Sequence, residues 1–302
     1  MSLIVTGSIG IDTVITPTGR ADDVLGGSCT YFAAAASFFT PVRIVAAVGE
    51  DFPDDQMAVF EHFKVDTAGL EKRAGSKTFR WTGEYHQNMN ERDSLETQLN
   101  VLGEDLPPVP DSYRDSEYVF LANTHPAGQM QLLEQFPKTK LVVADTMDLW
   151  INTAKDELLA LLEKLDGLVL NDSEAALLTG ASNMVAASKK IVEMGPKFVV
   201  IKKGEHGCLL QHTDGVGVMH AFPAANVVDP TGAGDSFAGG MMGYLAEVDR
   251  VDLRAIRRSL AYGTIVASFN IESFTLNRLK EISRHDIDQR LAEFGEAVSF
   301  DE

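Results

Sequence analysis

Short apolar runs alternate along this chain with segments of helical periodicity, and this alternation restricts its fold more than any other feature. The runs are rich in β-branched residues and apolar throughout, as in Leu141 to Ala144, so both faces of each predicted strand would be buried. Such strands alternating with helices predict a doubly wound α/β core with a parallel sheet. The predicted strands are Leu3 to Gly7, Val42 to Val48, Tyr118 to Ala122, Leu141 to Ala144, Gly167 to Leu170 and Phe198 to Ile201, and the main predicted helices are Gln129 to Phe136, Thr153 to Leu165, Ser182 to Met194, Ser236 to Glu247 and Leu253 to Phe269.

Two polar stretches interrupt this pattern, at about residues 12–23 and 76–102. Their alternating character, as in Phe79 to Tyr85, is typical of exposed antiparallel strands. We therefore expect a small β lid over the sheet. No internal repeat or flexible linker divides the chain, so residues 1–302 are predicted to form a single domain that includes this lid.

The composition argues against several classes of partner and site. The formal net charge is -18, so the phosphates of nucleic acid and of anionic membranes would be repelled. No apolar run approaches the roughly 20 residues that span a bilayer, and the first residues lack the features of an export signal. Cys29 and Cys208 are the only cysteines and lie far apart, which argues against a disulfide framework. We expect a cytoplasmic protein that binds neither nucleic acid nor membranes.

A glycine-rich turn within Val228 to Gly240 opens directly into an apolar helix. Small residues at Gly232, Ala233 and Gly234 let backbone N–H groups converge at the positive end of the helix, which favours an anion. Asp235 would sit in the first helical turn, where a carboxylate can accept a proton from an attacking hydroxyl. The plainer interpretation is a tight turn with an acid that complements the helix dipole. The length of the motif favours phosphoryl transfer.

The segment Asp-Pro-Thr-Gly-Ala-Gly-Asp-Ser-Phe at residues 229–237 resembles the C-terminal signature of the ribokinase-like (PfkB) family of carbohydrate and nucleoside kinases. Gly7 to Asp12 is similar to that family's substrate-contacting opening, and Gly26-Gly27 resembles its di-glycine signature. The resemblance implies a three-layer α/β/α core with a mostly parallel sheet and a β lid. It also implies that Asp235 is the catalytic base and that Gly232, Ala233 and Gly234 form an anion hole.

On the nucleotide side, Asn171 to Glu174 matches the family's Asn-x-x-Glu element, which implies that Asn171 and Glu174 organise Mg²⁺ and the phosphates. The same pair is also a plain capping box, and both interpretations can hold. Lys202 stands where the family often has threonine; it could pair with ATP phosphates or be a solvated loop charge. Three further residues are assigned to nucleotide binding by the resemblance: Gly204, Gly207 and Thr231.

On the acceptor side, the resemblance implies that Asp12 holds substrate hydroxyls and that Gly26 and Gly27 let the backbone approach the ligand. Tyr31 replaces an asparagine common in the sugar enzymes, and its ring could stack on a base or a sugar. His125 follows a strand end and is a candidate substrate contact, although a capped loop histidine is the more typical interpretation. Trp81 could cover the acceptor, pack within the lid or form a dimer contact.

The predicted function is phosphorylation of a hydroxyl group, typically a hydroxymethyl, on a sugar or nucleoside, with ATP and Mg²⁺. Many members of the family also use K⁺, which would lie beside Asp229 to Thr231, and many form homodimers through the lid. The alternative is a catalytically silent sensor of the same fold, which the retained Asp235 disfavours. Gly7 to Gly10 lacks the G-x-G-x-x-G spacing of dinucleotide enzymes, and no Walker A motif occurs.

Overall fold

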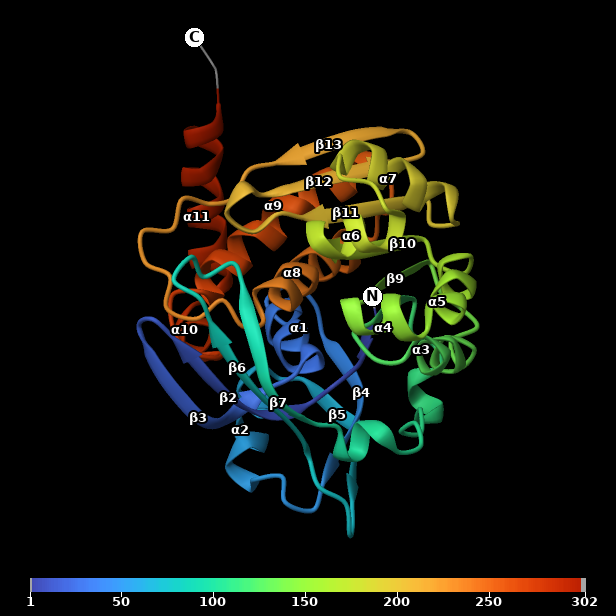
Figure 1. Cartoon of the computed structure of the whole chain (residues 1–302), viewed down its shortest axis with the longest axis vertical. Coiled ribbons are helices and arrows are strands. Elements are labelled where there is room, and N and C mark those ends of the chain that lie inside the picture. The colour runs from blue at the N-terminus through green and yellow to red at the C-terminus, as the bar shows by residue number, and fades with distance from the viewer. Residues whose placement is uncertain (1, 300–302) are drawn as a thin grey trace.

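The computed structural model describes residues 2–299 and consists of a large mixed sheet between helices and a smaller second sheet (Figure 1). The strands are β1 (Leu3–Thr6), β2 (Gly10–Thr16), β3 (Gly19–Gly26), β4 (Val42–Gly49), β5 (Asp66–Arg73), β6 (Phe79–Tyr85), β7 (Arg92–Gln98), β8 (Tyr118–Leu121), β9 (Leu141–Asp145), β10 (Gly167–Asn171), β11 (Phe198–Lys202), β12 (Cys208–His212) and β13 (Gly215–Met219). The helices are α1 (Ser28–Ala36), α2 (Asp54–His62), α3 (Pro126–Leu133), α4 (Asp148–Thr153), α5 (Lys155–Leu162), α6 (Asp172–Thr179), α7 (Met184–Glu193), α8 (Ala233–Val248), α9 (Leu253–Asn270), α10 (Asn277–Glu281) and α11 (Arg284–Val298), with short 3₁₀ turns η1 (Asn100–Gly103), η2 (Asp111–Tyr113) and η3 (Gly204–His206).

The large sheet has nine strands in the order β13-β12-β11-β10-β9-β8-β1-β4-β5. From β11 to β5 all neighbours are parallel, whereas β12 and β13 add an antiparallel edge. The mostly parallel sheet predicted from the sequence is therefore confirmed. The carboxyl ends of its central strands share one edge, which is where open α/β sheets bind their ligands.

Successive strand residues point to opposite faces of the sheet, and a separate apolar cluster covers each face. Leu3 and Val5 of β1 belong to the cluster that includes residues of α1, α8 and α9, whereas Ile4 belongs to the cluster that includes residues of α3, α5, α6 and α7. Phe32 of α1 and Phe120 of β8 stack with their ring centroids 4.4 Å apart. The three-layer α/β/α arrangement is thus confirmed, and it explains why the strand sequences are apolar throughout.

The small sheet, called the lid from here on, has four strands in the order β3-β2-β6-β7. Figure 1 shows these strands gathered below α1 and α8. The first lid hairpin extends beyond the predicted stretch of about residues 12–23 at both ends, because β2 begins at Gly10 and β3 ends at Gly26. The expectation of exposed antiparallel strands is wrong for the central pair: β2 and β6 are parallel, and Ile11 and Val14 of β2 are buried. Each of these two strands begins a separate hairpin, so they can enter the lid in the same direction.

The predicted helix Thr153 to Leu165 corresponds to α5, which is shorter at both ends. The backbone at Ala154 leaves the helical region, with φ -141° and ψ 42°, and separates α5 from α4, which was not predicted. Among residues 2–299, no helix combines the length and apolar character needed to cross a membrane.

Candidate active site

The glycine-rich turn lies at the start of α8, whose N-cap is Gly232 with φ 72°. A side chain at this position would be strained by that φ and would also collide with Tyr31, because an added Cβ would lie 2.2 Å from the tyrosine ring. Among residues 2–299, no side chain caps the N-terminus of α8. The positive end of the helix is therefore left for an anion.

A buried network holds this turn in shape. Asp229 accepts hydrogen bonds from the backbone N–H groups of Thr231 (2.8 Å) and Thr275 (3.1 Å). The amide of Asn270 donates to the carbonyl of Thr231 at 2.8 Å, and the hydroxyl of Ser236 lies 3.2 Å from the oxygen of Asn270. These hydrogen bonds join the turn to the end of α9 and to the segment that follows it, so the turn is held from a second part of the chain.

Asp235 lies in the first turn of α8 and is partly buried. Burial raises the pKa of Asp235, and the positive charges of Lys202 and Arg92 lower it in part. Lys202 reaches the turn from the end of β11: a Cβ added to Gly234 would lie 2.6 Å from its Nζ. A carboxylate with a raised pKa, next to an anion site that includes a positively charged side chain, is suited to accept a proton from an alcohol near neutral pH.

Asn171 and Lys202 are adjacent residues at the carboxyl ends of β10 and β11. Asn171 and Glu174 form a reciprocal capping box, with both hydrogen bonds at 2.8 Å. Burial raises the pKa of Glu174, and the charge of Lys202 opposes this. Within residues 2–299 no group of three or more His, Cys, Asp or Glu residues could hold a metal by itself. The residues fit Mg²⁺ held largely by water and phosphate, which is how that ion commonly binds.

Asp145 ends β9 and completes this edge, although the sequence reasoning missed it. Its side chain is 7% exposed, and its Oδ1 has no hydrogen-bond partner in the described chain. Burial and the nearby Asp235 raise the pKa of Asp145 well above its usual range, whereas Lys202 lowers it. An acid directly after the apolar run Leu141 to Ala144 was the available signal, because it had to lie at the carboxyl edge. Buried polar atoms without partners fit a site built for a polar ligand.

Asp12 and the di-glycine pair meet on the acceptor side. A Cβ added to Gly26 would lie 1.9 Å from Oδ2 of Asp12, and one added to Gly27, whose φ is 95°, would lie 2.4 Å from the carbonyl oxygen of Ser8. The Asp12 side chain is 4% exposed, and its Oδ1 has no partner in the described chain. Burial, reinforced by Asp229 and Asp235, raises the pKa of Asp12 to about 7.

Two tyrosines surround the turn. Tyr31 of α1 packs its buried ring against Gly232, and its pKa is raised well above the usual range by burial and then by Asp229. Its stacking on a substrate ring stays a prediction. Tyr85, at the end of lid strand β6, was not singled out from the sequence; its hydroxyl oxygen accepts a hydrogen bond from the Thr231 hydroxyl at 3.2 Å.

The remaining candidates have evident local roles. His125 is the N-cap of α3, where its Nδ1 accepts from the N–H of Ala127 at 3.2 Å, so the capped-histidine interpretation is confirmed. Trp81 donates from Nε1 to Ser94 at 3.0 Å within the lid.

Gly204 and Gly207 have φ values of 51° and 81° and shape the turn between β11 and β12. A Cβ on Gly207 would lie 2.0 Å from the carbonyl oxygen of Met219, so packing alone requires glycine there. Nucleotide contacts by these glycines stay a prediction.

Comparison with known proteins places these features in a family. The sequence profile of the pfkB family of carbohydrate kinases matches residues 23–281. A cytidine kinase from Thermococcus kodakarensis is 30% identical over 276 residues, which are 86% of this chain and 96% of that protein.

Solved structures share the fold. A nucleoside kinase from Methanocaldococcus jannaschii, an archaeal member of the ribokinase family, is 18% identical and covers 97% of this chain and 98% of its own, with a TM-score of 0.77. A putative ribokinase II from E. coli, in complex with ATP and Mg²⁺, is 17% identical; the match covers 97% of this chain and 99% of that chain, with a TM-score of 0.76. With the family profile spanning most of the sequence and the cytidine kinase similar along most of both chains, this protein belongs to the pfkB family and is a carbohydrate or nucleoside kinase.

Proposed function

We propose that this protein transfers the terminal phosphoryl group of ATP to a hydroxyl group, typically a hydroxymethyl, of a nucleoside or sugar, with Asp235 as the general base. The observation that carries the proposal is the position of Asp235: it lies in the first turn of α8, beside the uncapped turn Gly232 to Gly234, with Lys202 close by. An acid and an anion site this close together suit deprotonation of an alcohol that attacks a phosphoryl group.

The residues divide the reaction between them. Asp12, next to Gly26 and Gly27, holds the acceptor hydroxyls in line with the phosphoryl group. Asp235 takes the proton as the acceptor oxygen bonds to phosphorus, while the bond from phosphorus to the bridging oxygen of ADP breaks. The backbone N–H groups at Gly232 to Gly234 and the end of α8 stabilise the charge on the transferred group. The lid excludes water and so limits hydrolysis of ATP.

On the nucleotide side, Lys202 and Thr231 are proposed to contact the phosphates, and Gly204 and Gly207 to shape the wall of the nucleotide site. Mg²⁺ bound with ATP would neutralise part of the negative charge of the phosphates. Asn171 and Glu174 are proposed to hold its water shell. The unused oxygen of Glu174 supports this, since it makes no hydrogen bond within residues 2–299.

For the acceptor we favour a nucleoside. The support is the cytidine kinase from Thermococcus kodakarensis, together with the nucleoside kinase among the solved structures. A panel of nucleosides, free sugars and sugar phosphates, read by ADP release, discriminates between the classes. Turnover confined to free sugars would overturn the preference for a nucleoside.

A monovalent cation is proposed beside Asp229 to Thr231, on the basis of family membership. K⁺ there would add fixed positive charge next to the anion site. We expect activity to rise when K⁺ replaces a bulky organic cation at equal ionic strength. Equal activity in the two buffers would exclude this role.

The Asp235→Asn variant tests the mechanism. We expect kcat to fall by about 10²–10⁴-fold while ATP binding, measured by calorimetry, persists. Asp55→Asn is the matched control, because Asp55 also lies in a first helical turn but in α2, outside the site. Full turnover by Asp235→Asn would overturn the assigned base. A wild-type protein that binds ATP but turns over no acceptor would favour the silent sensor.

We propose that the whole chain acts as one kinase domain in the cytoplasm and forms a homodimer through the outer face of the lid. Cys29 and Cys208 are buried free thiols, which suits a reducing compartment. Gly83 and Tyr85 are buried and Glu84 is exposed, so the alternating Arg80 and Thr82 lie on the outer face with Glu84.

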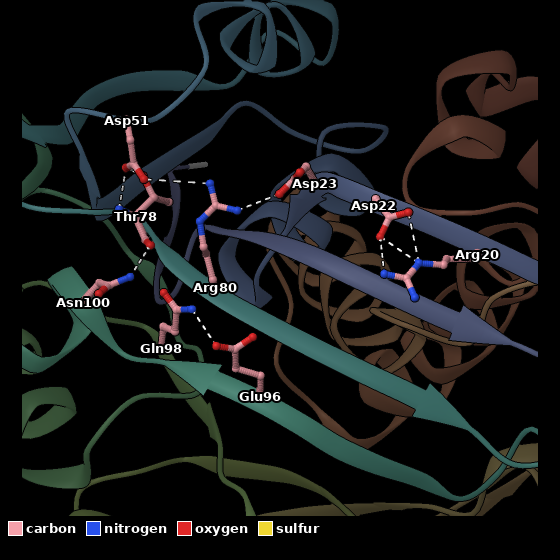
Figure 2. A network of polar contacts seen from close by, with 9 residues as sticks. All are labelled: Arg20, Asp22, Asp23, Asp51, Thr78, Arg80, Glu96, Gln98 and Asn100. Atoms are coloured by element: carbon pink, nitrogen blue, oxygen red, sulfur yellow. Dashed lines mark hydrogen bonds and ion pairs between the residues drawn. The ribbon is translucent and has the colours of Figure 1, made fainter.

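Figure 2 shows this outer face, where Arg80 donates to Asp23 at 2.6 Å and Arg20 pairs with Asp22. A cavity of about 360 Å³ lies between these charges, with Thr13 and Glu96 also in its wall. Side chains of both signs on one surface suit a symmetric contact with a second copy.

A further inference from the structure

The hairpin β6–β7 is hydrogen-bonded to the two turns of the proposed phosphate site, the turn before α8 and the turn after β11. Tyr85 accepts from Thr231, in the turn before α8, at 3.2 Å. Asn90, in the connection between the two strands, donates to Glu205, in the turn after β11, at 3.1 Å. Arg92 lies two residues after Asn90 and is the direct cross-strand neighbour of Tyr85. Arg92 therefore lies in the hairpin near both of the residues, Tyr85 and Asn90, that bond it to the core.

Arg92 is positioned differently from the other arginines of the lid. Arg20 pairs with Asp22 and Arg80 with Asp23, both on exposed carboxylates. Arg92 makes no ion pair with any residue in the described part of the chain, and its guanidinium lies 5.9 Å from the centroid of the Trp81 ring on the core-facing side. An arginine held on an aromatic ring keeps its planar donors available for an incoming anion.

The charge of Arg92 acts on the site below it. It lowers the pKa of Asp235 and of Glu174, after the larger effects of burial and Lys202. Lys202 approaches the same place from the sheet, since its Nζ would lie 2.6 Å from a Cβ on Gly234. Two cations, one from the core and one from the lid, thus converge on the N-terminal turn of α8.

We propose that Arg92 binds the terminal phosphoryl group of ATP, opposite Lys202, and so makes the lid part of the phosphoryl-transfer site. This inference rests on the proposed kinase function. During transfer the phosphoryl group passes from the bridging oxygen of ADP to the acceptor oxygen, and its equatorial oxygens stay within reach of both cations. Asp235 takes the acceptor proton, and Arg92 exchanges none because its guanidinium stays charged. Fixed cations on both sides stabilise this group more in transit than in bound ATP.

The test separates the terminal phosphate from the rest of the nucleotide. AMP-PNP, a non-hydrolysable ATP analogue, and ADP are titrated calorimetrically, with Mg²⁺, into the wild type, Arg92→Gln and Arg92→Lys. We expect Arg92→Gln to weaken AMP-PNP binding about 10-fold and to change ADP binding less than about 2-fold, with kcat about 10²-fold lower. Arg92→Lys is expected to keep part of the AMP-PNP affinity and part of kcat, because lysine keeps the charge but loses the bidentate geometry.

Arg114→Gln serves as the control for loss of an arginine, because among the described residues Arg114 pairs only with exposed Asp111, outside the site. We expect it to match the wild type in both titrations. Equal weakening of AMP-PNP and ADP in Arg92→Gln, or no weakening of either, would overturn the proposal. The nucleotide titrations need no acceptor, so a wild type without turnover would count against the proposed function and leave Arg92 testable.

Discussion

Burial raises the pKa of four aspartates: Asp12, Asp145, Asp229 and Asp235. Removing carboxylates from water disfavours their charged form. The charges of Asp229 and Asp235 also oppose the ionisation of Asp12, and the charge of Asp235 opposes that of Asp145. Such an arrangement lowers the stability of the fold at neutral pH. It is expected where the ionised form of an acid is needed for binding or proton transfer.

The Asp12→Asn variant shows this penalty directly. Burial raises the pKa of Asp12 to about 7 in the folded protein, well above the value of about 3.8 that is usual for an aspartate in water. Because the folded protein holds the proton more tightly, the wild type loses stability as the pH rises from the lower value to the higher one, and the loss is complete above about pH 7. We expect the stability advantage of Asp12→Asn to grow by about 2 kcal/mol between about pH 5.5 and about pH 8.

Urea denaturation at the two pH values measures the effect, and acceptor kinetics accompany it. We expect kcat/KM for the acceptor to fall in Asp12→Asn, since the amide cannot replace a carboxylate as a double acceptor. A stability difference that does not change with pH would show that Asp12 titrates normally.

At the level of elements, the junction of α1 and α8 determines the shape of the anion site. The ring of Tyr31 from α1 fills the space next to Gly232, and the small residues Gly239 and Gly243 let α8 approach α1 closely. A Cβ on Gly239 would lie 2.4 Å from the carbonyl oxygen of Phe32. The same helix contact that forms part of the core therefore sets the position of Asp235.

Gly232→Ala is expected to be more damaging than its backbone angle alone predicts. Gly180 provides the matched control: its φ is 68°, close to the 72° of Gly232, but nothing lies within 4 Å of an added Cβ. We expect Gly180→Ala to lower the free energy of unfolding by about 1 kcal/mol and Gly232→Ala by about 2–5 kcal/mol, the excess coming from the Tyr31 ring.

Chemical denaturation of both variants, and of Tyr31→Ala with and without Gly232→Ala, measures the steric coupling. We expect the double variant to lose less stability than the sum of its single changes, because a smaller residue 31 leaves room for the new Cβ. Strict additivity would place the penalty in the backbone alone.

On the scale of the whole molecule, the lid connects segments that are far apart in sequence. Thr18, in the turn between β2 and β3, donates to the carbonyl of Val228 at 3.0 Å, just before the glycine-rich turn. Asn90 reaches Glu205 in the same way from the other hairpin. Both lid turns are thus hydrogen-bonded to the core.

Charge reversal on the outer face of the lid tests the proposed homodimer. We expect Arg80→Glu to shift the protein toward monomer, because it removes the partner of Asp23 and places like charges in a self-complementary surface. Adding Glu96→Arg is expected to restore part of the association. Sedimentation velocity measures both. A wild type that sediments as a monomer at all concentrations would rule out this dimer.

The sequence by itself determined the core fold and much of the proposed site. Apolar runs such as Phe198 to Ile201 could only be buried on both faces, and the helices between them required a parallel sheet. The turn around Gly232 was recognisable because its residues are contiguous and because a left-handed backbone requires glycine. Those two kinds of information are local, so they can be deduced without knowing which distant segments meet.

Only the tertiary structure showed which distant residues join that turn. Arg92, Asp145 and Tyr85 come from three separate strands, and none belongs to a local motif. The parallel pairing of β2 with β6 and the approach of Lys202 to Gly234 likewise depend on how non-adjacent segments pack. The charges and burial that shift the pKa values of Asp12 and Asp235 arise from this packing, because electrostatic interactions depend on distance in space and not along the chain.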